Sequence, residues 1–162
     1  CIEAPFEKLP GVKAVVSGFT GGSKKNPTYD EVSAGGTGHT EAVEILFDPA
    51  AISYERLLEA FWRQIDPTDP GGQFVDRGSQ YRSGIFYLDQ SQKIAATKSK
   101  DALAASGRFK KRIVTEITAA SLFYPAEEYH QDFYKKSPAR DHEYRSGSGR
   151  DEFIESVWGK TK

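Results

Sequence analysis

The sequence predicts an α+β fold, a two-layer sandwich in which helices pack on a mainly antiparallel sheet and long coil segments join the elements. Segments with the helical spacing of apolar residues are mixed with segments that alternate as strands do, without a strict β-α-β order. Two long stretches rich in glycine separate them. The chain has 162 residues, of which 38% are hydrophobic, so we expect one domain over residues 1–162 with a sizeable core.

The first half of the chain predicts four elements around a long loop. Residues 1–9 favour a short helix, and the β-branched run 12–19 favours a strand. The glycine-rich stretch 20–39 predicts a long loop, and loops of this length are usually functional. Residues 41–48 alternate as a half-buried strand does, and the amphipathic run 52–65 predicts a helix.

The second half continues with shorter elements. A loop rich in Pro and Gly is followed by a strand, a helix with a polar face, a second strand and a short helix that begins at a proline. These segments are residues 66–83, 84–88, 89–106, 112–118 and 125–138, in that order. The tail predicts coil with one late helix from Asp151. Ser53 is the expected N-cap of the helix before the loop, and Asp89 or Ser91 that of the helix after it.

Composition and charge exclude several classes of function. The chain carries 22 Lys+Arg against 23 Asp+Glu, a net charge of -1, so nothing points to nucleic acid or an anionic membrane as a partner. No stretch reaches the ~18 apolar residues of a membrane span. The single cysteine, Cys1, excludes an internal disulfide framework, so the chain needs no oxidising compartment and we expect it in the cytoplasm. Nothing in the sequence suggests an obligate oligomer, so we expect a monomer. Because the sequence does not begin with Met, an upstream targeting segment stays open.

Candidate functional residues gather in the two glycine-rich stretches. Tyr29, His39 and Glu41 belong to the first stretch or follow it, and Asp76 and Tyr81 belong to the second. Glycine lets a ligand approach the backbone, and polar side chains on loops carry function more often than core residues do. Each has an ordinary alternative: the two acids could face solvent or form a turn, and the two tyrosines could simply pack.

A metal site and a reactive thiol are two further possibilities that the residue types raise. The three histidines lack the spacing of a metal site, so we expect neither a metal nor another cofactor. Cys1 stands at the start of a predicted helix, where the helix dipole favours the thiolate form. An inert terminal thiol is the alternative for Cys1.

Taken together, these segments resemble the peptide methionine sulfoxide reductase A family. The matching stretches include FEKLPGVKAVVSGFTGG, NPTY, GTGHTEAVEILFDP and DPTDPGGQFVDRGSQYRSGIFYL, and the match runs from residue 3 to about residue 135. The resemblance implies a ferredoxin-like version of the fold and reduction of the S epimer of methionine sulfoxide, free or in proteins, to repair oxidised protein. It also implies a sulfenic acid intermediate and thioredoxin or another thiol as the electron partner.

The resemblance also implies roles for the candidate residues. Glu41 corresponds to the acid that protonates the departing oxygen, which requires a raised pKa. Tyr29 and Tyr81 correspond to hydroxyl donors that hold this oxygen, and Asp76 to a carboxylate that orients groups around the thiol. His39 is counted among the substrate-binding residues.

The family's nucleophile belongs to a G-C-F-W signature, which the resemblance places immediately upstream of Cys1. Cys1 is then the neighbour of the nucleophile and a candidate resolving thiol. Three explanations stay open: an upstream segment outside this sequence, a truncated chain, or attack by Cys1 itself. Direct attack of a reductant on the sulfenic acid is the alternative to resolution by Cys1. The alternative function is an inactive relative that binds methionine sulfoxide; a thioredoxin-type oxidoreductase is disfavoured because the chain has no CxxC motif.

Overall fold

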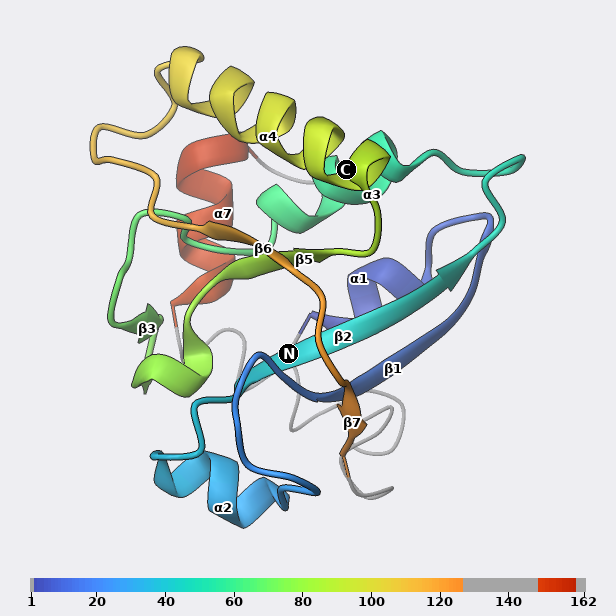
Figure 1. Ribbon diagram of the computed structural model, residues 1–162. Coiled ribbons are helices and arrows are strands. Elements are labelled where there is room, and N and C mark those ends of the chain that lie inside the picture. Colours follow the sequence, from blue (N-terminus) through green and yellow to red (C-terminus); the bar gives the residue numbers. More distant parts are fainter. Residues whose placement is uncertain (1, 127–148, 160–162) are drawn as a thin grey trace.

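The computed structural model describes residues 2–126 and 149–159, with strands in two sheets and one hairpin (Figure 1). The larger sheet has β1 (Val12–Thr20) at its centre, paired antiparallel with β2 (Thr40–Phe47) and β7 (Tyr124–Pro125). In the register, Phe19 of β1 lies opposite Glu41 of β2. The mixed helix and strand content and the antiparallel sheet agree with the prediction from the sequence.

The short strand β7 was not predicted, because the sequence favours a helix that begins at Pro125. Tyr124 and Pro125 instead pair with Phe19 and Gly18. Gly18 permits this close approach, since a side-chain carbon on it would lie 2.3 Å from the carbonyl oxygen of Tyr124. The rest of the predicted helix, from residue 127 on, lies outside the described residues.

The second sheet is parallel, whereas the sequence predicted one mainly antiparallel sheet. β5 (Gly84–Tyr87) pairs with β6 (Glu116–Ala119) in parallel, and α4 (Gln90–Ala105) connects them. A parallel pair needs such a crossover, and the helix supplies it. The predicted strand at 112–118 begins later than expected, at Glu116.

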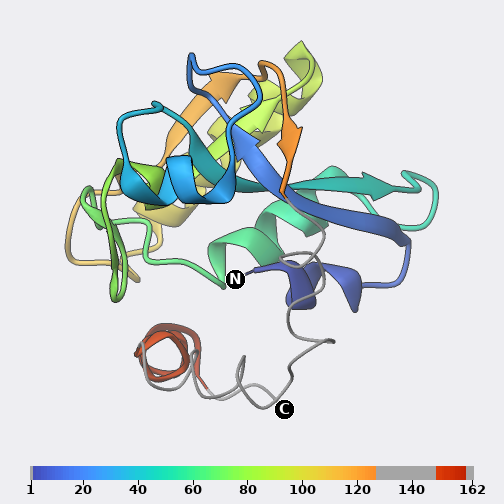
Figure 2. The same ribbon diagram turned by 90° about the horizontal axis from the view of Figure 1, so that it is seen from below.

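Apart from the one predicted at 125–138, the predicted helices are present, and side-chain caps explain where two of them begin. α1 (Glu3–Glu7) and α3 (Tyr54–Trp62) lie on the same side of the long strands β1 and β2 (Figure 2). The Ser53 hydroxyl accepts the backbone N–H of Arg56, and Asp89 caps α4 by accepting the N–H of Gln92. None of the helices in the described part is long and apolar enough to cross a membrane.

Both predicted loops contain short elements that the sequence analysis missed. The first holds the helix α2 (Tyr29–Ala34). The second holds the hairpin of β3 (Gly72–Gln73) and β4 (Asp76–Arg77), followed by the 3-10 turn η1 (Ser79–Tyr81). The loops are therefore more ordered than their glycine content suggests.

The core consists of two clusters that meet at α3. The first cluster lies between α3, α4 and β5, and the second between α1, α3 and the larger sheet. Phe61 of α3 packs against both clusters and so joins them. The late helix expected from Asp151 is present as α7 (Arg150–Trp158), and its Trp158 packs against the first cluster.

Candidate active site

Glu41 lies at the start of β2, on the face that the strand turns toward the second core cluster. Side chains alternate along a strand, so Glu41 shares its face with Val43, Ile45 and Phe47, which pack against that cluster. Part of the Glu41 side chain stays exposed, but the protein around its carboxyl group displaces much of the water. This burial raises the pKa of Glu41 to about 7, and the charge of Asp76 acts in the same direction. A substantial fraction of Glu41 is therefore protonated near neutral pH.

Tyr81 ends η1 and lies within electrostatic reach of three other candidate residues. Burial raises the pKa of Tyr81 to about 12, and Glu41, Tyr29 and Asp76 each add to the rise. A hydrogen bond with the Ser33 side chain acts in the opposite direction. The phenol therefore keeps its proton at neutral pH, where it can donate a hydrogen bond. These electrostatic effects indicate that the four candidate residues lie near one another. We refer to Glu41, Tyr29, Tyr81 and Asp76 as the cluster.

Tyr29 is the first residue of α2, whose start is fixed by a capping box. The Thr28 hydroxyl accepts the backbone N–H of Glu31 at 3.1 Å, and the Glu31 carboxylate accepts the N–H of Thr28 at 3.1 Å. The amide side chain of Gln80 in η1 donates to the carbonyl oxygen of Ser33 at 3.0 Å. This bond holds α2 against η1, so it helps to fix the position of Tyr29 relative to Tyr81.

Asp76 begins β4 and is half-buried in the hairpin, where it pairs with Gln73. Burial raises the pKa of Asp76, while the charge of Arg150 from α7 lowers it. The base of the hairpin is closed by Arg77, whose guanidinium donates to both carboxylate oxygens of Asp69 at 2.5 and 2.9 Å. The bonds between Arg77 and Asp69 therefore stabilise the hairpin that carries Asp76.

His39 is buried, with both ring nitrogens bonded to the backbone of the glycine-rich stretch. Nδ1 accepts the N–H of Gly22 at 3.1 Å, so Nε2 carries the proton and donates to the carbonyl oxygen of Lys24 at 2.6 Å. The ring also meets the edge of Tyr124 at 5.5 Å. Only 1% of His39 is exposed. The imidazole has no hydrogen-bonding atom left for a substrate.

Thr40, which the sequence analysis did not single out, connects the strand that carries Glu41 to the segment that carries Tyr81. Its hydroxyl lies 3.1 Å from the carbonyl oxygens of Gln80 and Arg82, on either side of Tyr81. Arg82 adds to this connection by donating to the carbonyl oxygens of Ser79 and Gly38. No local signal marks Thr40, because its partners lie 40 and 42 residues further along the chain.

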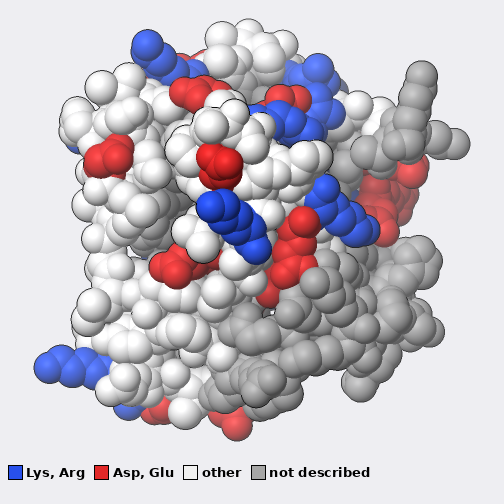
Figure 3. All heavy atoms as spheres, turned by 90° about the vertical axis from the view of Figure 1, so that its right-hand side faces the viewer, with Lys and Arg blue, Asp and Glu red and all other residues white. Residues whose placement is uncertain are grey.

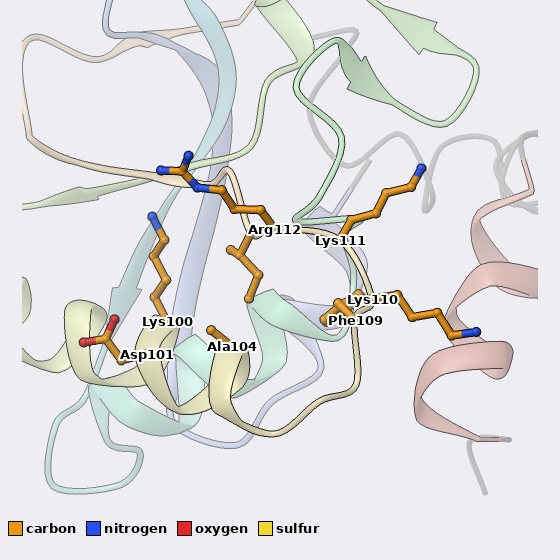
Figure 4. Close-up of a pocket in the computed structure, with 8 residues that line it drawn as sticks. Lys100, Asp101, Ala104, Phe109, Lys110, Lys111 and Arg112 are labelled. Atoms are coloured by element: carbon orange, nitrogen blue, oxygen red, sulfur yellow. The ribbon is translucent and has the colours of Figure 1, made fainter.

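Two hollows in the described part of the structure contain none of the four clustered residues. One, of about 390 Å³, lies between α4 and residues 109–113, and half of the residues that line it are basic, among them Lys100, Lys111 and Arg112 (Figure 4). The other, of about 280 Å³, is lined by Thr40 and Arg82 among others. The face in Figure 3 carries interspersed positive and negative side chains, which agrees with the near-zero net charge.

Cys1 lies outside the described residues, as do His130 and His142. Among residues 2–126 and 149–159, no group of three or more His, Cys, Asp or Glu side chains could hold a metal ion. The chemistry available in the described site is therefore that of a protonated carboxyl group, two phenols and a second carboxylate.

Comparisons with known proteins cover the segment that carries these residues. The family model described as "Peptide methionine sulfoxide reductase" matches residues 1–162. A protein of Listeria monocytogenes serotype 4a (strain HCC23), named "Peptide methionine sulfoxide reductase MsrA", is 60% identical over 158 residues, which are 98% of this chain and 89% of that protein. A protein of the same name from Bacillus subtilis (strain 168) is 58% identical over 159 residues, 98% of this chain and 90% of that protein.

A solved structure is similar as well. The structure of methionine sulfoxide reductase A of Corynebacterium diphtheriae superposes with a TM-score of 0.73 at 35% sequence identity. The match covers 84% of this chain and 69% of that chain. The similarity therefore extends from the sequence to the arrangement of helices and strands.

Proposed function

Since the chain belongs to the peptide methionine sulfoxide reductase family, we propose how its described residues serve that reaction. The enzyme is a peptide-methionine (S)-S-oxide reductase, an oxidoreductase that reduces the S epimer of methionine sulfoxide to methionine. The alternative of an inactive relative that only binds the sulfoxide is not favoured, because the matching proteins are named as reductases.

Glu41 is the general acid in this proposal. The oxygen of a sulfoxide is a poor leaving group unless it gains a proton, so the site needs a neutral acid. The observation that carries the assignment is the pKa of Glu41, which burial raises to about 7. At that value the carboxyl group holds a proton near neutral pH and also releases it readily, which is the condition for efficient acid catalysis.

Tyr29 and Tyr81 hold the sulfoxide oxygen beside Glu41. Support comes from the electrostatic influence of Tyr29 and Glu41 on Tyr81, and from burial that keeps the phenol of Tyr81 protonated. Two hydroxyl donors aimed at one oxygen stabilise the negative charge that develops on it as the bond to sulfur breaks. Asp76 shares the site and orients the polar groups around the thiol.

The thiol steps complete the reaction. A cysteine thiolate attacks the sulfoxide sulfur, the oxygen passes to the cysteine as a sulfenic acid, and one proton is consumed. The cysteine is thereby oxidised by two electrons and the sulfoxide reduced by two. A second thiol then condenses with the sulfenic acid, releases water and leaves a disulfide, which thioredoxin or another thiol reduces. Cys1 is one candidate for the second thiol; the reductant itself is the other.

His39 takes a different role in this proposal from the substrate contact that the resemblance implies. Its two ring nitrogens bond to Gly22 and Lys24. We assign it to positioning the backbone that leads into β2, where Glu41 stands.

The finer description of the fold also belongs to the proposal. We regard the two sheets as one layer and α1, α3 and α4 as the other, in a single ferredoxin-like domain. Phe61 of α3 supports this arrangement because it packs against the core clusters of both sheets. We further place the enzyme in the cytoplasm, since its single cysteine calls for no oxidising compartment. The proposal takes the enzyme as a monomer.

The test is an assay of the intact enzyme on the separated epimers of a methionine sulfoxide peptide, with dithiothreitol or thioredoxin as reductant. We expect one methionine formed per disulfide from the S epimer and none from the R epimer. Saturable binding of the S epimer without methionine formation would instead identify an inactive relative.

A further inference from the structure

The hairpin that presents Asp76 turns through a residue in an unfavourable backbone conformation. Gln73 pairs with Asp76, so Phe74 and Val75 form a two-residue connection. Phe74 has a φ of 55°, in the left-handed region. Two-residue hairpins place glycine, asparagine or aspartate at such positions, whereas a bulky side chain there needs support from its surroundings.

The support comes from α7, more than seventy residues further along the chain. The guanidinium of Arg150 lies over the ring of Phe74, 4.6 Å from its centre, and the ring of Phe153 meets Phe74 edge-on at 5.5 Å. Figure 1 shows the beginning of α7 beside β3. Two side chains of one helix thus hold the ring at the tip of the hairpin.

Arg150 also connects this contact to the rest of the protein. It is only 5% exposed, and its Nη1 donates to the carbonyl oxygen of Gln64, just after α3. A buried guanidinium bonded to the scaffold is a rigid support, because little freedom remains in the side chain. The positive charge of Arg150 also acts on Asp76.

We propose that Arg150 and Phe153 are positioning residues of the reductase: they hold Phe74 in its left-handed conformation and so fix the direction in which the hairpin presents Asp76. This inference rests on the role proposed above for Asp76. It assigns to the C-terminal helix a part in the reaction, through a contact with the hairpin and without a contact to the substrate.

The experiment combines Arg150→Gln with Phe74→Gly in the intact enzyme. Arg150→Gln alone should lower kcat by roughly tenfold to a hundredfold with little change in KM, the effect of a misplaced group in an active site. Glycine adopts the left-handed conformation without support. In the Phe74→Gly background the same Arg150→Gln change should therefore lower kcat by less than about threefold. Equal losses in both backgrounds would overturn the proposal.

Arg108→Gln is the matched control. Arg108 stacks on Trp158 at the other end of α7, 4.5 Å from the ring centre, and donates to the carbonyl oxygen of Val157. Its loss should lower the melting temperature and leave kcat unchanged. If Arg108→Gln lowers kcat as much as Arg150→Gln, the effect reflects a loosened helix and not the hairpin.

A pH profile provides a readout that a purely structural role would not move. Within the described residues, the charged group that acts on the pKa of Asp76 is Arg150, which lowers it against the effect of burial. The titratable groups that share this surrounding are Glu41 and Tyr81, whose pKa values Asp76 raises in turn. Arg150→Gln should shift the acidic limb of kcat to higher pH. Arg150→Lys, which keeps the charge and serves if the glutamine variant does not fold, should leave the limb near its original position. A limb that moves equally in both variants contradicts the proposal.

Asp76→Asn separates this inference from the function on which it rests. If Asp76→Asn leaves kcat unchanged, the role proposed for Asp76 fails. If Asp76→Asn lowers kcat and Arg150→Gln does not, the role of Asp76 stands and the positioning by α7 fails.

Discussion

The hydroxyl of Thr40 lies 3.1 Å from the carbonyl oxygen of Arg82. This contact fastens the strand that carries Glu41 to the segment that carries Tyr81, two residues of the proposed site that stand far apart in the sequence. The same hydroxyl lies 3.1 Å from the carbonyl oxygen of Gln80. The relation between the acid and the phenol therefore depends in part on the buried side chain of Thr40.

Thr40→Val removes this hydroxyl and keeps the shape of the side chain. We expect a loss of roughly 1–3 kcal/mol in the free energy of unfolding, because the two carbonyl oxygens lose the hydroxyl proton that they share. We also expect a lower kcat/KM for the S sulfoxide, because Tyr81 is less firmly held. Thr97→Val on α4, which removes a hydroxyl that donates to the carbonyl oxygen of Lys93, is the control. Equal kcat/KM in the two variants would contradict the positioning role of Thr40.

Glu41→Gln tests the general acid directly. The amide can hydrogen-bond to the sulfoxide oxygen but cannot protonate it, so we expect kcat to fall by roughly 10²–10⁴. With the pKa of Glu41 at about 7, the wild-type rate should decline as the pH rises above that value. The variant should lack this decline. A rate equal to that of the wild type from about pH 6 to 9 would show that Glu41 is not the acid.

The raised pKa of Glu41 also makes the stability of the folded chain depend on pH. Its pKa is about 7 in the folded protein and 4.5 ordinarily, so between these values the folded state keeps a proton that the unfolded state has released. The stabilisation is complete below pH 4.5 and is lost as the pH rises toward 7. Thermal unfolding from pH 4 to 8 should show this loss in the wild type and in Glu44→Gln, on the opposite face of β2, but less of it in Glu41→Gln. Identical slopes in the three proteins would contradict the assignment.

His39→Phe distinguishes a positioning role from contact with the substrate. Phenylalanine keeps the contact with Tyr124 but leaves the N–H of Gly22 and the carbonyl oxygen of Lys24 without their partner. Urea unfolding should report a loss of roughly 1–3 kcal/mol. His39→Asn, which can replace one of the two bonds, should lose less. A raised KM with unchanged stability would instead support the substrate contact that the resemblance implies.

The caps and the apolar patterns explain why the larger helices and strands could be predicted from the sequence. Ser53 and Asp89 each accept a backbone N–H at the start of a helix, as expected from their residue types. The helix at Tyr29 was missed because the surrounding glycines favoured a loop, although Thr28 and Glu31 form a capping box that the sequence displays. Strand β7 could not be predicted, since it exists by pairing with β1, about a hundred residues earlier.

In the candidate site, too, the sequence indicated some features and not others. The residue types of Glu41, Tyr29, Tyr81 and Asp76 drew attention in the sequence, and the resemblance suggested their roles. The features that arrange them are long-range and carry no local signal. These features are the Thr40 hydroxyl, the left-handed Phe74 and the guanidinium of Arg150.

The two tyrosines offer a test of shared action, because both hydroxyls would bind one oxygen. Tyr29→Phe or Tyr81→Phe alone should lower kcat only about three- to tenfold, since the other hydroxyl still donates. The double variant should lose roughly 10²–10³, more than the product of the two single losses, because the developing oxyanion then has no phenol donor. The pKa of Tyr81 is raised to about 12, so its phenol stays protonated from pH 6 to 9. The losses in kcat of the single and double variants should therefore stay constant over this range. Tyr87→Phe on β5 removes a phenol outside the site and controls for the loss of a hydroxyl in general. A double variant no slower than the poorer single variant would mean that Tyr29 and Tyr81 do not act on the same oxygen.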